Sequence, residues 1–305
     1  MQIKTIEKII TSKLIQWLES ITDQDLRIRV KDNLLLSGGS IANLMMDVPV
    51  NDYDIYIKDR DVLKSLVNYY VKPFSDIWVA DGRERESLMD QYKVLEAGDN
   101  DGTNNSYHQT SIRNLKPDQI KLMFHSKNGG KKVNEGKDDL NYDPVFFSPN
   151  AISLSDDVQI VLRFWGDSKQ IHETFDFVHA TNYFTFKEGL VRNIEALESI
   201  LSKTLKYQGS HYPVTSIIRA KKFIKRGFNI GAGEMLKIMF QISQLDLSKP
   251  DVLEEQLIGV DVAYFELLIE ALRSKYSSDP DFKLESPYFN SLIDKIFNET
   301  GGEEN

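Results

Sequence analysis

The sequence predicts an α+β domain, a mixed sheet with flanking helices, followed by an all-α domain. Short apolar runs bounded by turn residues occupy 34–36, 52–58, 145–154 and 158–165, which is the pattern of β-strands. Beyond about residue 186, apolar residues recur at helical spacing between glycine and proline breaks, which is the pattern of successive helices. We therefore place the α+β domain at 1–185 and the helical domain at 186–300.

The first elements follow from local patterns. Residues 3–21 predict an amphipathic helix, because apolar side chains recur at three- and four-residue spacings. These side chains are Ile3, Ile6, Ile10, Leu14, Trp17, Leu18 and Ile21. Residues 34–36 and 52–58 predict the first two strands, with a helix at 41–46 between them. Asp59 is a good N-cap for a further helix that runs to about residue 71.

The segment at about 95–145 predicts a loop-rich insertion, because glycine, asparagine and aspartate dominate it outside an apolar run at 120–124. We interpret it as a surface excursion; the alternative is a lid that contacts substrate through Lys127, Lys131 and Lys132. Beyond it, residues 169–174 predict a short helix and 175–183 a strand. The later helices are predicted at 190–205, 216–226, 232–245, 263–272 and 288–297.

The composition narrows the function. The 305 residues include no cysteine, which excludes disulfides, thiolate zinc sites and cysteine nucleophiles and is consistent with a cytoplasmic protein. No apolar run approaches the roughly 18 residues of a membrane span, so we expect no membrane partner. The net charge of −9 argues against broad electrostatic capture of nucleic acid. Any contact with RNA therefore needs a local basic patch.

The most informative motif joins two glycines to two aspartates. Gly38, Gly39 and Ser40 follow the first predicted strand, and Asp52 and Asp54 open the second. Glycines let the backbone approach a phosphate, and the helix that follows offers its N–H groups. Two carboxylates two residues apart on a strand project from the same face, which is costly unless a cation lies between them. The motif therefore predicts a site for a phosphate and a divalent metal.

This motif resembles the signature of the DNA-polymerase-β-like nucleotidyltransferase superfamily, a glycine turn followed by Asp-x-Asp on a strand. Its form is nearest to the CCA-adding and poly(A) polymerase branch. That branch carries Arg-Asp where this chain has Ala42-Asn43, and its downstream arginine-rich motif is absent here. The resemblance implies a palm domain that uses two Mg²⁺ ions, with Gly38, Gly39 and Ser40 on the phosphates.

The resemblance also implies a third metal-binding carboxylate on a later strand. Asp176 is the best candidate, because it interrupts the apolar run at 175–183, where an aspartate is costly unless paired or metal-bound. The alternative is an aspartate that caps a turn. Weaker candidates at segment ends are Asp143, Asp157 and Asp167. On a strand, His179 would point away from Asp176, so we interpret it as structural.

A basic segment lies in the helical half. Residues 219–226 hold five cations, and on a helix Arg219, Lys222 and Arg226 fall within about 60° of one another. We expect this face to meet the triphosphate or an RNA backbone, with Arg219 and Lys222 as the first choices. The alternative is an ordinary solvated face.

Together these features predict a nucleotidyltransferase with Asp52, Asp54 and Asp176 as its catalytic and metal-binding residues. It would transfer a nucleoside monophosphate from a nucleoside triphosphate to a hydroxyl, with an RNA 3′ end as the preferred acceptor. One alternative is a toxin-like or signalling enzyme that modifies a protein side chain or a second nucleotide. Another is a non-catalytic nucleotide-binding module. The base and the oligomeric state stay open.

Overall fold

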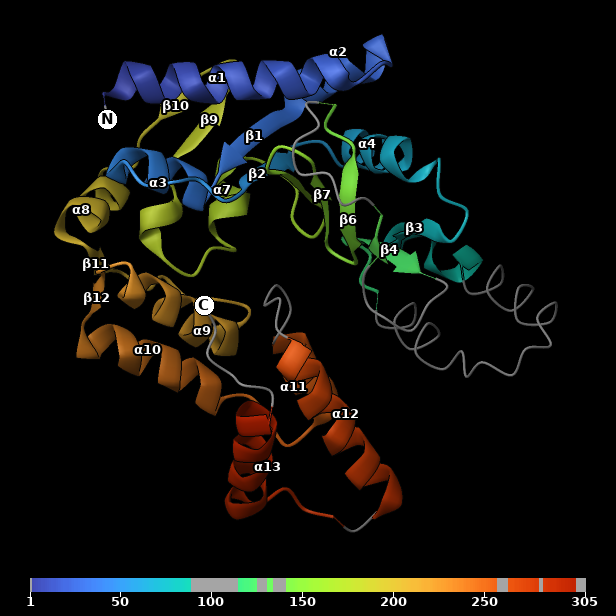
Figure 1. The fold of residues 1–305 in the computed structure, drawn as a ribbon, viewed down its shortest axis with the longest axis vertical. Helices are drawn as coiled ribbons and strands as arrows, with labels where there is room; N and C mark the ends of the chain where they lie inside the picture. Colours follow the sequence, from blue (N-terminus) through green and yellow to red (C-terminus); the bar gives the residue numbers. More distant parts are fainter. Residues whose placement is uncertain are drawn as a thin grey trace. The chain divides into compact units, whose positions relative to one another are not determined.

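The structure is a computed structural model that describes residues 2–88, 115–124, 131–133, 141–256, 263–279 and 282–299 (Figure 1). Its contacts divide the chain into two compact units. The first unit comprises Met1–Thr174 and His179–Ile200, and the second comprises Phe175–Val178 and Leu201–Asn305. The domain limits predicted from the sequence, 1–185 and 186–300, stay a prediction.

The first unit contains a mixed eight-stranded sheet in the order β10-β9-β1-β2-β8-β7-β6-β5. Neighbouring strands are antiparallel, except that β2 and β8 are parallel. This confirms the predicted mixed α and β character of this part of the chain. The strands are β1 (Leu34–Ser37), β2 (Tyr53–Ile57), β5 (Lys131–Lys132), β6 (Pro144–Ser148), β7 (Ala151–Leu154), β8 (Val158–Val161), β9 (Tyr183–Thr185) and β10 (Gly189–Val191).

Helices of the first unit flank this sheet, and a separate antiparallel pair is formed by β3 (Ile77–Asp81) and β4 (Ile120–Phe124). Asp59 caps α4 by accepting hydrogen bonds from the backbone N–H groups of Asp61 and Val62, as predicted. The helices are α1 (Ile3–Ser20), α2 (Gln24–Asn33), α3 (Gly39–Met46), α4 (Arg60–Val71), α7 (Ser168–His172) and α8 (Ile194–Ser202).

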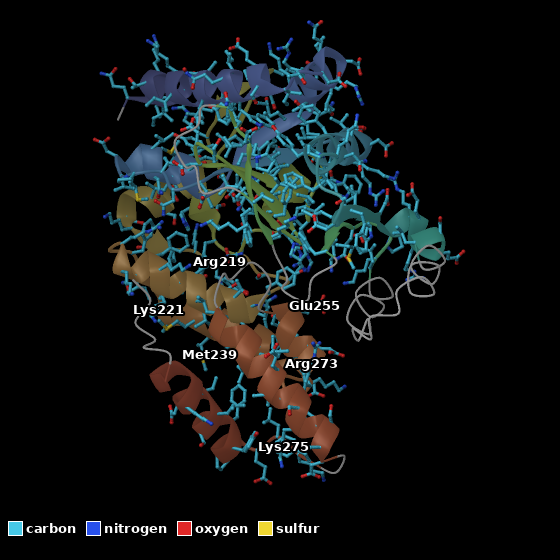
Figure 2. The ribbon with its side chains drawn as sticks, turned by 45° about the vertical axis from the view of Figure 1, so that its right-hand side comes forward. Arg219, Lys221, Met239, Glu255, Arg273 and Lys275 are labelled. Carbon is cyan, nitrogen blue, oxygen red and sulfur yellow. The ribbon has the colours of Figure 1, made fainter. Side chains whose placement is uncertain are left out.

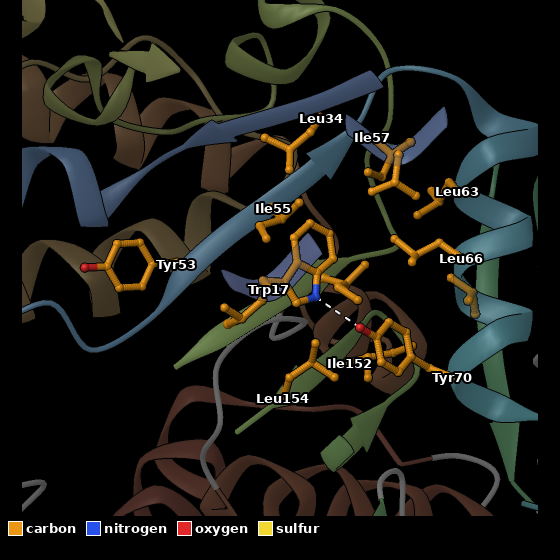
Figure 3. Close-up of a cluster of buried hydrophobic side chains, with 14 of the residues drawn as sticks. Trp17, Leu34, Tyr53, Ile55, Ile57, Leu63, Leu66, Tyr70, Ile152 and Leu154 are labelled. Atoms are coloured by element: carbon orange, nitrogen blue, oxygen red, sulfur yellow. Dashed lines mark hydrogen bonds between the residues drawn. The ribbon is translucent and has the colours of Figure 1, made fainter. Parts of the chain in front are cut away.

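The core lies between one face of the sheet and the helices α1 and α4 (Figure 3). Alternate residues of the strands, such as Leu34, Ile55 and Ile152, are fully buried there. A buried hydrogen bond of 3.0 Å from Trp17 Nε1 to the hydroxyl of Tyr70 joins the two helices (Figure 3). The other face carries Asp54, Gln159 and Ser153, which alternate with core residues along β2, β8 and β7 and are partly buried.

The second unit is mainly helical, but it is not shown to be an all-α domain. It also contains a short parallel strand pair, β11 (Thr204–Leu205) and β12 (Asn229–Ile230). Its helices are α9 (Pro213–Lys225), α10 (Ala232–Ser243), α11 (Pro250–Gln256), α12 (Ala263–Ser278) and α13 (Ser286–Glu299). The predicted helix at 190–205 is wrong at its start, because Gly189–Val191 pairs with β9 and α8 begins only at Ile194.

The strand predicted at 175–183 is wrong. The chain forms a 3₁₀ turn at Val178–Ala180, and only Tyr183–Thr185 enters the sheet. The reason lies outside the segment: Phe177 forms an isolated bridge with Tyr207 of the second unit. Because the segment is not a strand, strand geometry does not turn His179 away from Asp176; the His179 side chain is buried, with 1% exposure.

Within the described residues, none of the helices has both the length and the apolar character that crossing a bilayer requires.

Candidate functional site

The glycine turn and an aspartate of the motif meet in the first unit. Gly38 follows β1 with φ +100°, a left-handed conformation that favours glycine. A Cβ atom at Gly38 would lie 3.3 Å from Oδ2 of Asp54. The turn therefore needs a glycine both for its conformation and for the space beside the carboxylate.

The start of α3 is a candidate place for an anion. No side chain in the described part of the chain caps this helix, so its first N–H groups lack the usual partner. A Cβ atom at Gly39 would find no atom within 4 Å among the described residues. Ser40 is only 2% exposed, and its Oγ has no hydrogen-bond partner among those residues. A buried hydroxyl beside uncapped N–H groups at a positive helix end is suited to a phosphate.

A buried polar network holds the turn in place. Ser37, which is 0% exposed, donates a hydrogen bond of 2.8 Å from Oγ to the carbonyl of Asn182. The Nε2 atom of His172 lies 2.9 Å from the same Oγ. The backbone N–H of Gly38 donates to the carbonyl of Ala180 at 3.1 Å. The strand end that leads into the glycine turn is therefore fixed by segments far away in the sequence.

Burial lowers the pKa of His172 to about 4, so its imidazole is neutral near pH 7. Because the Ser37 hydroxyl donates to Asn182, it can accept a hydrogen bond from His172, which assigns the proton to Nε2. The sequence did not indicate His172 and Asn182 as parts of the site, and it indicated no role for Ser37, which directly precedes the glycines. No local motif marks His172 or Asn182, since 135 and 145 residues separate them from Ser37.

The two aspartates of the motif lie at the beginning of β2. Asp54 is on the strand and partly buried, whereas Asp52 precedes the strand and is exposed. On the parallel neighbour β8, the register partner of Asp54 is Gln159. The amide nitrogen of Gln159 donates to the hydroxyl of Ser153 on β7 at 3.2 Å. Polar side chains of three adjacent strands are thus neighbours on this face.

The fit to a metal is partial. Asp52 and Asp54 supply carboxylate oxygens, which Mg²⁺ prefers, beside a helix start suited to phosphate, and Mg²⁺ is often held by one or two carboxylates plus substrate phosphates. Among the described residues, no group of three or more His, Asp or Glu side chains is placed to hold a metal ion. The pair therefore fits a metal that also binds a phosphate, and the role predicted for Asp176 as a third ligand stays a prediction.

Asp176 lies in the second unit, where its carboxylate forms an ion pair of 3.0 Å with Arg219 of α9. The Asp176 side chain is 10% exposed and its backbone carbonyl accepts from Gln208 N–H. Burial raises the pKa of the nearby Tyr207 hydroxyl to about 12. A hydrogen bond with Ser216 lowers this pKa in part, and the negative charge of Asp176 raises it further. The structure thus joins two residues for which the sequence predicted separate roles.

The basic face of α9 is only partly available to a ligand. Arg219 is engaged by Asp176, whereas Lys222 and Arg226 are exposed. Figure 2 shows Arg219 and Lys221 on this helix. The predicted phosphate contacts of Arg219 and Lys222 stay predictions.

The lysines proposed as a lid have different outcomes. Lys127 lies outside the described residues. Lys131 is paired with Asp76 through two contacts of 2.7 Å and lies over the ring of Phe74. The ion pair gives Lys131 a structural role that the sequence did not indicate.

A mixed sheet that packs helices on one face, with the uncapped start of α3 beside Asp54, defines an α+β protein with a candidate phosphate site. The chain belongs to the Gabija anti-defense 2 family, whose model matches residues 8–203. The matched range includes the glycine turn, both motif aspartates and Asp176, and it ends before α9.

One relative is the protein called Gabija anti-defense 2 of Bacillus phage SPbetaL7, which is 24% identical over 149 residues. The aligned part is 46% of this chain and 37% of the relative, so the match spans little more than a third of that protein.

Among solved structures, the chain is similar to the Thermotoga maritima CCA-adding enzyme complexed with tRNA, with 12% identity and a TM-score of 0.41 over 100% of this chain and 62% of that chain. It is also similar to a CCA-adding enzyme in complex with ATP, with 11% identity and a TM-score of 0.40 over 97% and 60% of the two chains. A likeness at this level assigns no activity to the chain.

Proposed function

We propose that this chain is a metal-dependent nucleotidyltransferase, which binds a nucleoside triphosphate and transfers a nucleoside monophosphate to a hydroxyl acceptor. The observation that supports the proposal most directly is the uncapped start of α3, where the buried Ser40 hydroxyl lacks a partner within the described chain and Asp54 lies against the glycine turn. Phosphate and carboxylate are both anions, so a phosphate at this helix start would need a cation between it and Asp54.

The residues of the first unit have separate roles in this proposal. The N–H groups at the start of α3 and the Ser40 hydroxyl bind phosphate oxygens and orient the triphosphate. Asp52 and Asp54 would hold Mg²⁺, which would neutralise phosphate charge and activate the attacking hydroxyl. Ser37 and His172 keep the turn in the conformation that leaves the helix start open.

The acceptor defines two versions of the proposal. An RNA 3′ end is the first, because the motif form is nearest to enzymes that extend RNA. The second is a protein or nucleotide of a bacterial defence system, because the chain belongs to a family described as anti-defence. The net charge of −9 also favours an acceptor that is less anionic than RNA.

Label transfer tests the proposal. The protein is incubated with Mg²⁺, each α-labelled nucleoside triphosphate, and either total RNA or a bacterial lysate, and labelled macromolecules are separated by size and nuclease sensitivity. We expect label in one acceptor class and pyrophosphate release. Asp54→Asn should reduce both by at least about 100-fold, comparable to removing a principal electrostatic group. The control is Asp25→Asn, which removes an exposed carboxylate of α2 and should leave transfer unchanged.

Binding of triphosphate without pyrophosphate release in any mixture would contradict the enzyme and support the non-catalytic module. Equal transfer by Asp54→Asn and by the unaltered chain would show that Asp54 is not part of the active site.

A further inference from the structure

The strand next to Asp54 carries an amide at the level of the carboxylate. Asp54 and Gln159 are register partners on the parallel strands β2 and β8, so their side chains leave the sheet on the same face. Neighbouring strands are about 4.8 Å apart, which brings these side chains within reach of one shared ion. Both residues are partly buried rather than fully exposed.

The orientation of Gln159 follows from its neighbour on the other side. Its Nε2 donates to Oγ of Ser153, the register partner of Gln159 on β7. With the amide nitrogen used in this way, Oε1 has no hydrogen bond to any described residue. The amide oxygen of Gln159 is therefore available for a further partner on the strand next to Asp54.

The charge of the site makes a neutral donor suitable here. Asp52 and Asp54 already bring two negative charges to a place where phosphate adds more, so a third carboxylate would increase repulsion before any metal binds. Amide carbonyl oxygens bind hard divalent cations without adding charge. An amide that is held by a second hydrogen bond also loses less freedom when it binds.

We propose that Gln159 is a further oxygen donor to the divalent cation held by Asp52 and Asp54, with Ser153 as its positioning residue. The inference rests on the proposed function, since it assumes that the aspartate pair binds a metal. It gives the first unit a metal site of two carboxylates and one amide that does not involve Asp176.

Binding of Mn²⁺ alone tests this inference, because it needs neither nucleotide nor turnover. The free Mn²⁺ signal in electron paramagnetic resonance is titrated with the full chain and its variants. We expect Gln159→Leu to weaken binding by about 10-fold or more, in the range seen when a residue that supports a metal site is removed. Gln159→Glu, which keeps an oxygen at the same position, should bind Mn²⁺ at least as tightly as the unaltered chain. Gln16→Leu, at an exposed glutamine of α1, is the matched control and should change nothing.

The outcomes separate the inference from the proposed function. If Asp54→Asn abolishes Mn²⁺ binding while Gln159→Leu leaves it unchanged, the inference is wrong and the aspartate pair stands. If the unaltered chain binds no Mn²⁺, the metal part of the proposed function fails together with the inference. Weaker Mn²⁺ binding by Gln159→Glu than by the unaltered chain would also overturn the inference. This second test does not depend on whether Gln159→Leu folds.

Discussion

Adjacent glycines at the start of α3 have different physical tasks. Gly38 adopts φ +100° and leaves room for Oδ2 of Asp54, whereas Gly39 is the first residue of the helix and faces open space within the described structure. The first glycine is required by the fold, and the second is required only if something binds above it. Substitution by alanine separates these two requirements.

We expect Gly38→Ala to lower the free energy of unfolding by about 1–3 kcal/mol, because a left-handed alanine is strained and its methyl group crowds Asp54. Gly39→Ala should leave stability unchanged or raise it by up to about 1 kcal/mol, since alanine is the better helix former. It should nevertheless weaken triphosphate binding, because its methyl group occupies the space that we assign to phosphate. Urea unfolding and calorimetric titration with a triphosphate measure the two effects. Unchanged triphosphate binding by Gly39→Ala would contradict the placement of the phosphate at this helix start.

His172 predicts a pH dependence of stability. Burial lowers its pKa to about 4, whereas a histidine in an unfolded chain titrates near 6.5. Its contribution to stability is therefore complete above about pH 6.5 and is lost as the pH falls towards 4, because the unfolded chain binds the proton first. The slope is at most about 1.4 kcal/mol per pH unit and smaller in practice, since His172 is only partly buried. Denaturant unfolding between pH 7.5 and 4.5 should show a shallower decline for His172→Gln, which can still donate to Ser37. Parallel curves for the two proteins would contradict the neutral assignment.

Residues of the candidate site differ in how visible they are in the sequence. Gly38 and Asp54 are recognisable because both belong to one short motif, and the structure places them in contact range. Gln159 and His172 are not, because each reaches the site through strand register or a bond between distant segments. Their positions depend on the assembled sheet, and no local pattern encodes that assembly.

At the scale of helices and strands, the sequence predicts an element correctly where the apolar residues of one face are also the residues that the element buries. The helix α1 shows this, since its periodic apolar residues are those buried in the core. The segment 175–183 shows the opposite: Phe177 packs edge-on against Phe223 of α9 and both belong to the second unit, whereas Tyr183 lies on a strand of the first unit. Apolar residues there indicate burial correctly but give no information on which unit buries them.

The hydrogen bond between α1 and α4 offers a test of stability, and the adjacent tyrosine of α4 provides the control. Tyr70→Phe should lower the free energy of unfolding by about 1–3 kcal/mol, because Nε1 of Trp17 stays buried without its acceptor. Tyr69→Phe removes the same atom from the same helix, but its hydroxyl bonds the backbone of Thr22 in an exposed place where water can replace it. We expect a change within about 0.5 kcal/mol for that variant. Thermal and denaturant unfolding of both variants measure the difference. Equal losses of unfolding free energy would show that the buried bond stabilises the protein no more than the exposed one.

At the scale of the whole molecule, charge limits how this chain can meet RNA. A net charge of −9 repels a polyanion at long range, so attraction must come from a local surface. The exposed cations of α9 are the candidate surface, and Lys222 and Arg226 are better probes than Arg219. Removing Arg219 would leave the carboxylate of Asp176, 10% exposed, without its ion-pair partner and would destabilise the unit for reasons unrelated to RNA.

The double variant Lys222→Ala with Arg226→Ala therefore tests which ligand this face binds. Lys72→Ala with Lys283→Ala removes the same charge from exposed positions elsewhere and is the control. If α9 binds an RNA backbone, RNA affinity should fall and its log–log salt slope should flatten by about one per lost phosphate contact, while triphosphate affinity stays constant. If α9 binds the triphosphate, the Michaelis constant for nucleotide should rise and the salt slope for RNA should not change. A double variant that matches its control in both titrations would show that this face is only solvated. Because the net charge of −9 repels a polyanion, that result would favour the version of the proposal in which the acceptor is a protein or a nucleotide.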